Sequence, residues 1–297
     1  MTVSLFFQHL ANGISLGALY ALIAIGYTMV YGILRLINFA HGDIVMVAAY
    51  VAFYGAAMYA LPWWLAFPLA ILLTAGLGMI IERAAYRPLR GVPRIQLFTS
   101  AVAVSFLLEN LGIVVFSGRP KAFPRPAFLD KPLHVGDVII ISYTPVAVAV
   151  ALILFGGLLY IVHRTKVGMA MRALSKDIET TGLMGVDTDR VIMIAFAIGS
   201  ALAAAGGILL AIKFPQINPL MGVVPGLKAF IAAVLGGIGN ITGAMIGGFL
   251  LGIAEIMIVA FFPQLAGYRD AFAYTILIAL LLFRPTGLMG EVEPEKA

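Results

Sequence analysis

Two acidic residues, Glu109 and Glu255, stand inside long apolar runs of the chain. A charged side chain is costly within hydrocarbon, so such residues are candidates for function, and with His41 they could relay protons in a proton-coupled carrier. Further polar side chains in or beside these runs could line a solute pathway: Asn12, Tyr20, Tyr27 and Asn38. Tyr20 and Tyr27 favour this interpretation because their spacing places them on one helical face. Buried hydrogen bonding or packing also explains each of these residues.

The chain lacks the residue patterns of enzymes and metal centres. It has no Cys, which excludes disulfides, thiolate ligands and iron–sulfur clusters, and with only four scattered His residues we expect no metal site. It contains no G-x-x-x-x-G-K-S/T phosphate loop, no H-E-x-x-H and no G-x-S-x-G motif. We therefore expect a non-catalytic chain that carries no cofactor of its own.

The elements that must position these residues are membrane helices. Hydrophobic residues make up 62% and charged residues 11% of the 297 positions. Soluble domains carry roughly 25% charged residues, so the composition excludes a soluble enzyme, a disordered chain and a nucleic-acid binder. The apolar runs are too long and too uniformly apolar for barrel strands. They cover residues 10–34, 44–61, 63–82, 95–116, 139–162, 190–212, 224–238, 241–262 and 270–283.

These runs predict an all-α integral membrane protein, a polytopic bundle of about 8–9 transmembrane helices in a single domain over residues 1–297. The run 224–238 is short, glycine-rich and interrupted by Lys228, so we expect discontinuous or re-entrant segments. Basic residues gather in the connections 83–94 and 163–190, which places both in the cytoplasm. With every run counted as a crossing, the N-terminus then lies outside.

Glycines recur in the C-terminal third of the chain. Gly239, Gly243 and Gly247 stand at every fourth position, which predicts a smooth helix face that packs closely on a neighbouring helix. The segments 35–43 and 236–243 link apolar runs, and each could be a break in a helix that faces an internal cavity.

The connection 163–190 is long and polar for a membrane protein. Its sequence predicts short helices over 165–174 and 177–184. They are either amphipathic helices lying along the membrane surface or a docking element for a soluble partner.

Several blocks of sequence resemble the permease family of branched-chain amino acid ABC importers, and more closely its LivH-like member. The blocks span almost the whole chain: 12–22 (NGISLGALYAL), 26–32 (GYTMVYG), 37–43 (INFAHGD), 82–90 (ERAAYRPLR), 183–192 (LMGVDTDRVI), 232–239 (AAVLGGIG) and 284–288 (RPTGL). The resemblance implies a permease subunit for branched-chain or related neutral amino acids. It also implies a multi-pass protein of the bacterial inner membrane.

The resemblance further implies that the connection 163–190 is a coupling loop. Permeases of this kind present a coupling helix to a separate ATPase within a loose E-A-A-x-x-x-G pattern, which residues 179–185 (ETTGLMG) match with two threonines in place of alanines. The coupling residues implied are Arg172, Glu179, Gly182, Met184 and Gly185.

The partners implied are a second, LivM-like permease, two ATP-binding subunits that hold ATP and Mg, an extracytoplasmic substrate-binding protein and membrane lipid. Nucleic acid is not expected. Other substrates stay open, because similar permeases carry urea, short amides or aromatic acids. A secondary transporter driven by protons through Glu109 or Glu255 is a less favoured alternative, and a channel is a third.

Overall fold

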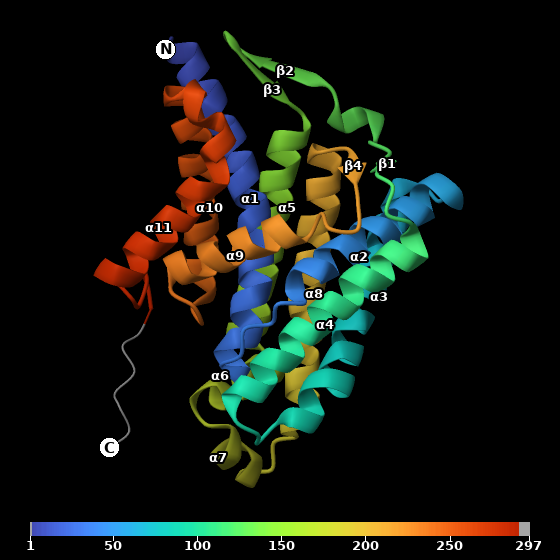
Figure 1. The fold of residues 1–297 in the computed structure, drawn as a ribbon, viewed down its shortest axis with the longest axis vertical. Coiled ribbons are helices and arrows are strands. Elements are labelled where there is room, and N and C mark those ends of the chain that lie inside the picture. The colour runs from blue at the N-terminus through green and yellow to red at the C-terminus, as the bar shows by residue number, and fades with distance from the viewer. Residues whose placement is uncertain (1, 291–297) are drawn as a thin grey trace.

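The computed structural model describes residues 2–290, apart from the side chains of Arg94 and Val135. Within this range, eight helical segments are long and apolar enough to cross a membrane, and one shorter apolar helix joins them. The fold predicted from the sequence, a polytopic all-α membrane protein, is therefore confirmed (Figure 1).

The longer helices are α1 (Val3–Leu34), α2 (His41–Phe53), α3 (Trp63–Ile81), α4 (Arg94–Phe116), α5 (Tyr143–Arg164), α8 (Thr188–Lys213), α9 (Val223–Gly236), α10 (Ile241–Phe261) and α11 (Arg269–Phe283). Two short helices, α6 (Lys166–Lys176) and α7 (Ile178–Leu183), fill the connection 163–190 close to the predicted positions. Within the described residues, four short strands complete the fold: β1 (Lys121–Ala122), β2 (Pro132–Val135), β3 (Val138–Ile141) and β4 (Gln216–Ile217).

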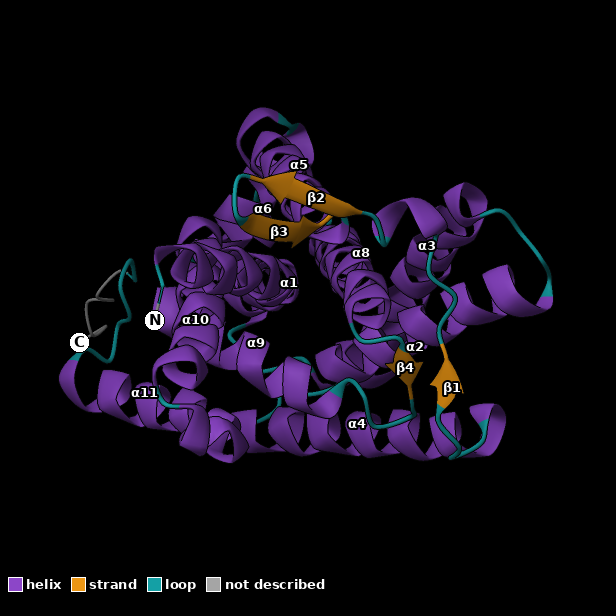
Figure 2. Cartoon of the chain, turned by 90° about the horizontal axis from the view of Figure 1, so that it is seen from above, coloured by secondary structure: helices purple, strands orange, loops and turns teal. Residues whose placement is uncertain are grey.

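Helix α1 is the centre of the bundle. It is apolar on all sides, and it packs against α10, α8, α9 and α5. Figure 2 shows α1, α8 and α9 inside a rim that includes α3, α4, α5 and α11. Small residues permit the closest approaches, since a Cβ on Gly26 would lie 2.5 Å from the carbonyl oxygen of Gly199 in α8. The rim helices keep many apolar side chains exposed, as expected of surfaces that meet lipid or another membrane chain.

Two helices begin within the bundle, and their starts touch. Helix α1 ends at Leu34, and its C-cap Arg35, with φ of 53°, turns the chain before α2 begins at His41. Helix α9 begins at Val223 after the link 218–222. A Cβ on Gly42 would lie 2.6 Å from the oxygen of Gly222, and one on Gly226 would lie 2.7 Å from the Cα of Gly42. Glycine is required on both sides of this contact because backbone meets backbone.

The two ends of the bundle carry different structures (Figure 1). One end holds the N-terminus and the antiparallel hairpin of β2 and β3, in which Pro132 pairs with Ile141. The strands β1 and β4 also pair antiparallel, joining Lys121 to Ile217. The other end holds α6, α7 and the turn between α3 and α4. We call these the outer end and the inner end, after the orientation predicted by the basic connections. None of the four strands was expected from the sequence.

Two glycine-rich expectations need correction. Gly239 precedes α10 and lies in a turn with φ of 96°, so it does not share the helical face of Gly243 and Gly247. The segment 236–243 is a turn between α9 and α10 that binds the C-terminal segment, where Met289 N donates to Gly236 O (2.9 Å) and Asn240 Nδ2 donates to Met289 O (2.9 Å). Sequence spacing alone does not reveal where a helix begins, and Asn240 begins this one by capping Gly243 N.

Candidate functional site

The inner end presents a protruding helical element built from α6 and α7. Thr165 Oγ1 caps α6 by accepting from Gly168 N (3.0 Å), and Asp177 Oδ1 caps α7 by accepting from Thr180 N (3.0 Å). Gly185 ends the element with φ of 83°, a conformation that favours glycine. Its N–H donates to Gly182 O (3.0 Å). These local bonds set the ends of α6 and α7, and the buried residues Met171 and Leu174 pack α6 against the bundle.

The tip of α7 is apolar and open. Leu183 and Met184 are 83% and 80% exposed, and Glu179 is exposed one turn earlier. Large apolar side chains at a solvent-facing tip are typical of a protein interaction surface. Arg172 is placed differently from the rest of this predicted set. It donates to Val162 O at the end of α5, so its guanidinium ties α6 to a membrane helix.

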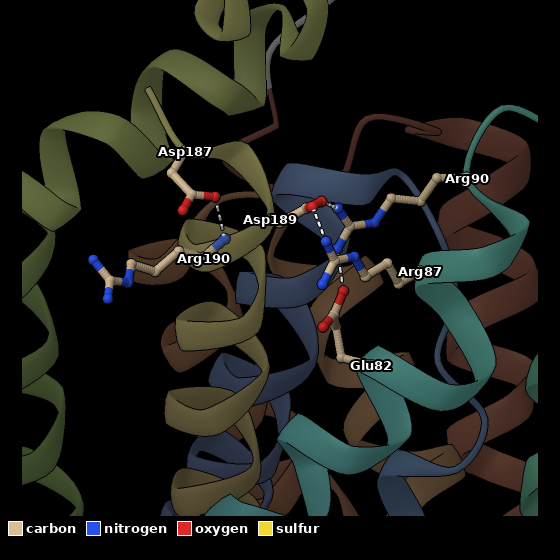
Figure 3. Close-up of polar contacts among 6 residues, drawn as sticks. All are labelled: Glu82, Arg87, Arg90, Asp187, Asp189 and Arg190. Atoms are coloured by element: carbon tan, nitrogen blue, oxygen red, sulfur yellow. Dashed lines mark hydrogen bonds and ion pairs between the residues drawn. The ribbon is translucent and has the colours of Figure 1, made fainter. Parts of the chain in front are cut away.

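An ion-pair cluster lies beside this element, at the start of α8 (Figure 3). Asp189, in the first turn of α8, pairs with Arg87 and with Arg90, whose Nη1 lies 2.5 Å from Asp189 Oδ1. Arg90 also pairs with the buried carboxylate of Glu82. Asp187 caps α8 through Arg190 N (3.0 Å). The cluster joins the start of α8, just after α7, to the turn between α3 and α4.

A second charged network lies in the bundle around α9. Lys228 pairs with Glu255 of α10 and lies 2.6 Å from Asp270 of α11, while Arg269 Nε lies 2.5 Å from Glu255 Oε1. The Lys228 ammonium also stands 5.7 Å from the ring centre of Tyr20. Lys228 and Glu255 are buried, and a buried charge persists only where an opposite charge faces it.

A cavity of about 250 Å³ borders this network. Its wall is formed by α1, the end of α8, the start of α9 and the start of α11. Three charged side chains and Tyr20 reach it, beside apolar residues: Leu16, Leu210, Phe214, Met221 and Val224 among them. A wall of this kind offers both polar and apolar contacts to a small solute.

The seven predicted pathway residues do not form one site. Tyr20 lines the larger cavity, whereas Tyr27 and Glu109 line a smaller cavity of about 80 Å³ with Asp43, which accepts from Ser105 Oγ (2.5 Å). Of the remaining four, Glu255 lies in the charged network and Asn12 lies on the surface. His41 Nε2 donates to Ile23 O (3.0 Å), and Asn38 Oδ1 accepts a hydrogen bond from the Tyr86 hydroxyl (2.7 Å).

The sequence analysis missed the partners of Glu255. In the sequence, Lys228 only interrupts the short run 224–238, and no pattern distinguishes Arg269 or Asp270. A usable signal was present, because a cation and an anion in neighbouring apolar runs each need an opposite charge in the membrane. Helix packing decides which cation meets which anion, and the sequence does not reveal that packing.

The glycines of α10 pack against two neighbouring helices, α9 and α1. Gly243 and Gly247 face α9, where a Cβ on either would overlap the backbone of Gly236 or Ala232. The next pair along the helix faces α1 in the same way, since a Cβ on Gly252 would overlap Gly17. Close helix contact in hydrocarbon depends on such small residues.

Comparison with known proteins identifies relatives over nearly the full chain. A family model described as branched-chain amino acid transport system / permease component matches residues 9–281. The chain is 43% identical to the high-affinity branched-chain amino acid transport system permease protein BraD of Pseudomonas aeruginosa, over 98% of both chains. It is 40% identical to LivH of Escherichia coli K12, a permease protein of the same description, over 98% of this chain and 97% of LivH. A ribose import permease of Haemophilus influenzae, RbsC, is 27% identical over 88% of this chain and 80% of its own length.

Proposed function

This chain belongs to the family of branched-chain amino acid transport system permease components, and from that membership we propose that it forms one half of the solute pathway of an ABC importer. A second, LivM-like permease supplies the other half. The cargo proposed is leucine, isoleucine, valine or a related neutral amino acid. The support for this cargo is the higher identity to BraD and LivH than to the ribose permease.

The protein is a multi-pass membrane protein, and the membrane proposed is the bacterial inner membrane. ATP and Mg²⁺ bind two separate ATP-binding subunits, which hydrolyse ATP while this chain stays non-catalytic. A soluble binding protein delivers the amino acid at the outer end.

The observation that carries the proposal is the apolar tip of α7 at the inner end, where Leu183 and Met184 are almost fully exposed. In the assembled importer this tip sits in a cleft of an ATP-binding subunit, which removes its apolar surface from water. The ion pairs of Asp189 with Arg87 and Arg90 then carry rigid-body motion of α7 and α8 to the turn between α3 and α4.

The test combines copurification from native membranes with ATP-driven uptake. A tagged chain is expected to copurify with a second permease and an ATPase, and leucine-loaded binding protein is expected to stimulate hydrolysis. The double change Leu183→Asp and Met184→Asp should lower ATPase recovery and leucine uptake at least tenfold, because two charges then enter an apolar cleft. Arg190→Gln, an exposed change at the same end, is the matched control and should retain both.

Three other outcomes would change the proposal. Stimulation only by urea, a short amide or an aromatic acid would keep the importer and replace the cargo. If copurification and uptake both survive the α7 double change, the tip of α7 does not dock on the ATP-binding subunit. Uptake by the chain alone on a proton gradient would replace ATP-driven import with secondary transport.

A further inference from the structure

The cavity beside Lys228 has the size and the charge of a site for a small zwitterion. Its volume of about 250 Å³ is below the roughly 300–1,000 Å³ of pockets for drug-sized ligands. The cavity lies at the outer half of the bundle, because α8 ends there and β4 follows it. A solute released at the outer end therefore reaches it before the inner half.

The charges around the cavity balance. Lys228 and Arg269 are cations, Glu255 and Asp270 are anions, and three ion pairs link all four. A bound anion or cation would leave an uncompensated charge in a partly buried network, which is costly. A zwitterion adds no net charge, so it can bind when an existing ion pair opens and each of its two charges pairs with one end of the substrate.

The four charges differ in their freedom to exchange. The side chains of Lys228 and Glu255 are 6% and 1% exposed, whereas that of Asp270 is 54% exposed. Asp270 is therefore the partner that can turn away from Lys228 and meet an incoming cation.

We propose that this cavity binds the amino-acid head group, with the substrate carboxylate on Lys228 and Arg269 and the substrate ammonium on Asp270. The substrate side chain then lies against Leu16, Leu210 and Val224. The choice of an amino acid rests on the proposed function, but the assignment of head-group contacts rests on the cavity and its charges.

Binding by exchange of partners has a consequence for affinity. The substrate carboxylate takes the place of Asp270 beside Lys228, and Asp270 pairs with the substrate ammonium instead. Most of the electrostatic energy gained from these new pairs is therefore cancelled by the loss of the pair between Lys228 and Asp270. Tyr20 holds Lys228 in place through its ring during the exchange. The site is selective for a zwitterion but weak, which suits a step from which the cargo must leave.

The absence of Cys from the chain provides a direct assay. Val224→Cys places a single thiol in the cavity wall, and Phe214→Cys provides a second position from a different helix end. The complete importer in lipid nanodiscs, without binding protein, is treated with a charged methanethiosulfonate, and the modified fraction of this chain is read by intact mass. His134→Cys, exposed on the outer hairpin, is the control thiol.

Saturating L-leucine is expected to slow modification at Val224→Cys and Phe214→Cys several-fold and to leave His134→Cys unchanged. Isoamylamine lacks the carboxylate and 4-methylpentanoate lacks the ammonium, so neither should protect at the same concentration. Adding Asp270→Asn should raise the leucine concentration needed for protection about tenfold, because a charge-assisted bond is lost. Asp137→Asn, in the exposed hairpin turn, is the matched change and should leave that concentration unaltered.

The outcomes separate this inference from the function beneath it. Suppose that the importer takes up leucine with its binding protein but that leucine slows modification at neither cavity thiol. That result overturns the proposed site and leaves the importer function intact. Equal protection by isoamylamine or 4-methylpentanoate overturns the zwitterion contacts. An importer that does not take up leucine at all overturns the proposed cargo instead.

Discussion

Separating Lys228 from Glu255 tests whether the charged network around α9 is a coupled unit. The perturbations are Lys228→Met, Glu255→Met and the double change. Methionine approximates the length of both side chains and adds no charge. Each single change leaves one charge of the pair in a site where the side chains are only 6% and 1% exposed.

The structure sets the size of each effect. Removing one partner of a buried ion pair costs about 3–5 kcal/mol. The remaining charge keeps one partner here, Asp270 for Lys228 and Arg269 for Glu255, and those partners are 54% and 31% exposed. An exposed pair contributes only about 0–1 kcal/mol, so we expect each single change to cost about 3 kcal/mol.

The double change should cost far less than the two single changes together. It removes both buried charges and leaves Arg269 and Asp270, which are opposite in sign and partly in water. We expect a loss of about 3 kcal/mol for the double variant, which corresponds to a coupling energy of about 3 kcal/mol.

The assay is reversible SDS titration of the purified chain in bicelles, followed by circular dichroism. Asp130→Asn is the control, because the pair of Arg125 and Asp130 is 28% and 48% exposed at 3.1 Å, and its loss should cost less than about 1 kcal/mol. Additive losses in the double variant would refute the reasoning, since they would show that Lys228 and Glu255 do not stabilise one another.

Two backbone predictions follow from the glycines. Gly252→Leu should destabilise the chain by more than about 3 kcal/mol, because its Cβ would overlap the backbone of Gly17, whereas Gly156→Leu meets nothing within 4 Å and should be neutral; thermal unfolding of both variants checks this, and equal stability would contradict it. Gly185→Ala should strain the end of α7 by about 1 kcal/mol and lower ATP-driven uptake, since its φ is 83°, while Gly157→Ala in α5, whose added Cβ would meet nothing within 4 Å, should retain uptake. Unimpaired uptake by the Gly185 variant would argue that α7 tolerates displacement.

The membrane class and the inner element could be predicted because they depend on local sequence. A run of about 20 apolar residues crosses a bilayer wherever it stands in the chain, and most helix bounds follow from the runs. The helices over 165–174 and 177–184 were expected for a similar reason, since the caps Thr165 and Asp177 act within three residues of their own position.

The candidate site could be predicted only in part. Tyr20 and Glu255 were selected, because polar groups in apolar runs are visible in the sequence. Their grouping with Tyr27, Asn38 and His41 as one pathway stays a prediction. Tyr20 and Glu255 belong to the larger cavity and its charged network, whereas Tyr27 lines the smaller cavity and its ring centre lies 4.9 Å from that of His41. Helical spacing within one run does not determine which neighbour that face meets.

The sequence by itself determined that this chain spans the membrane, which of its segments are helices, and which family it resembles. Tertiary structure decided that Lys228 of α9 meets Glu255 of α10 and Asp270 of α11, and that Gly42 of α2 meets Gly222. Apolarity is a property of each segment and is read locally. A partner for a buried charge, or for a glycine surface, exists only after helices far apart in sequence have packed.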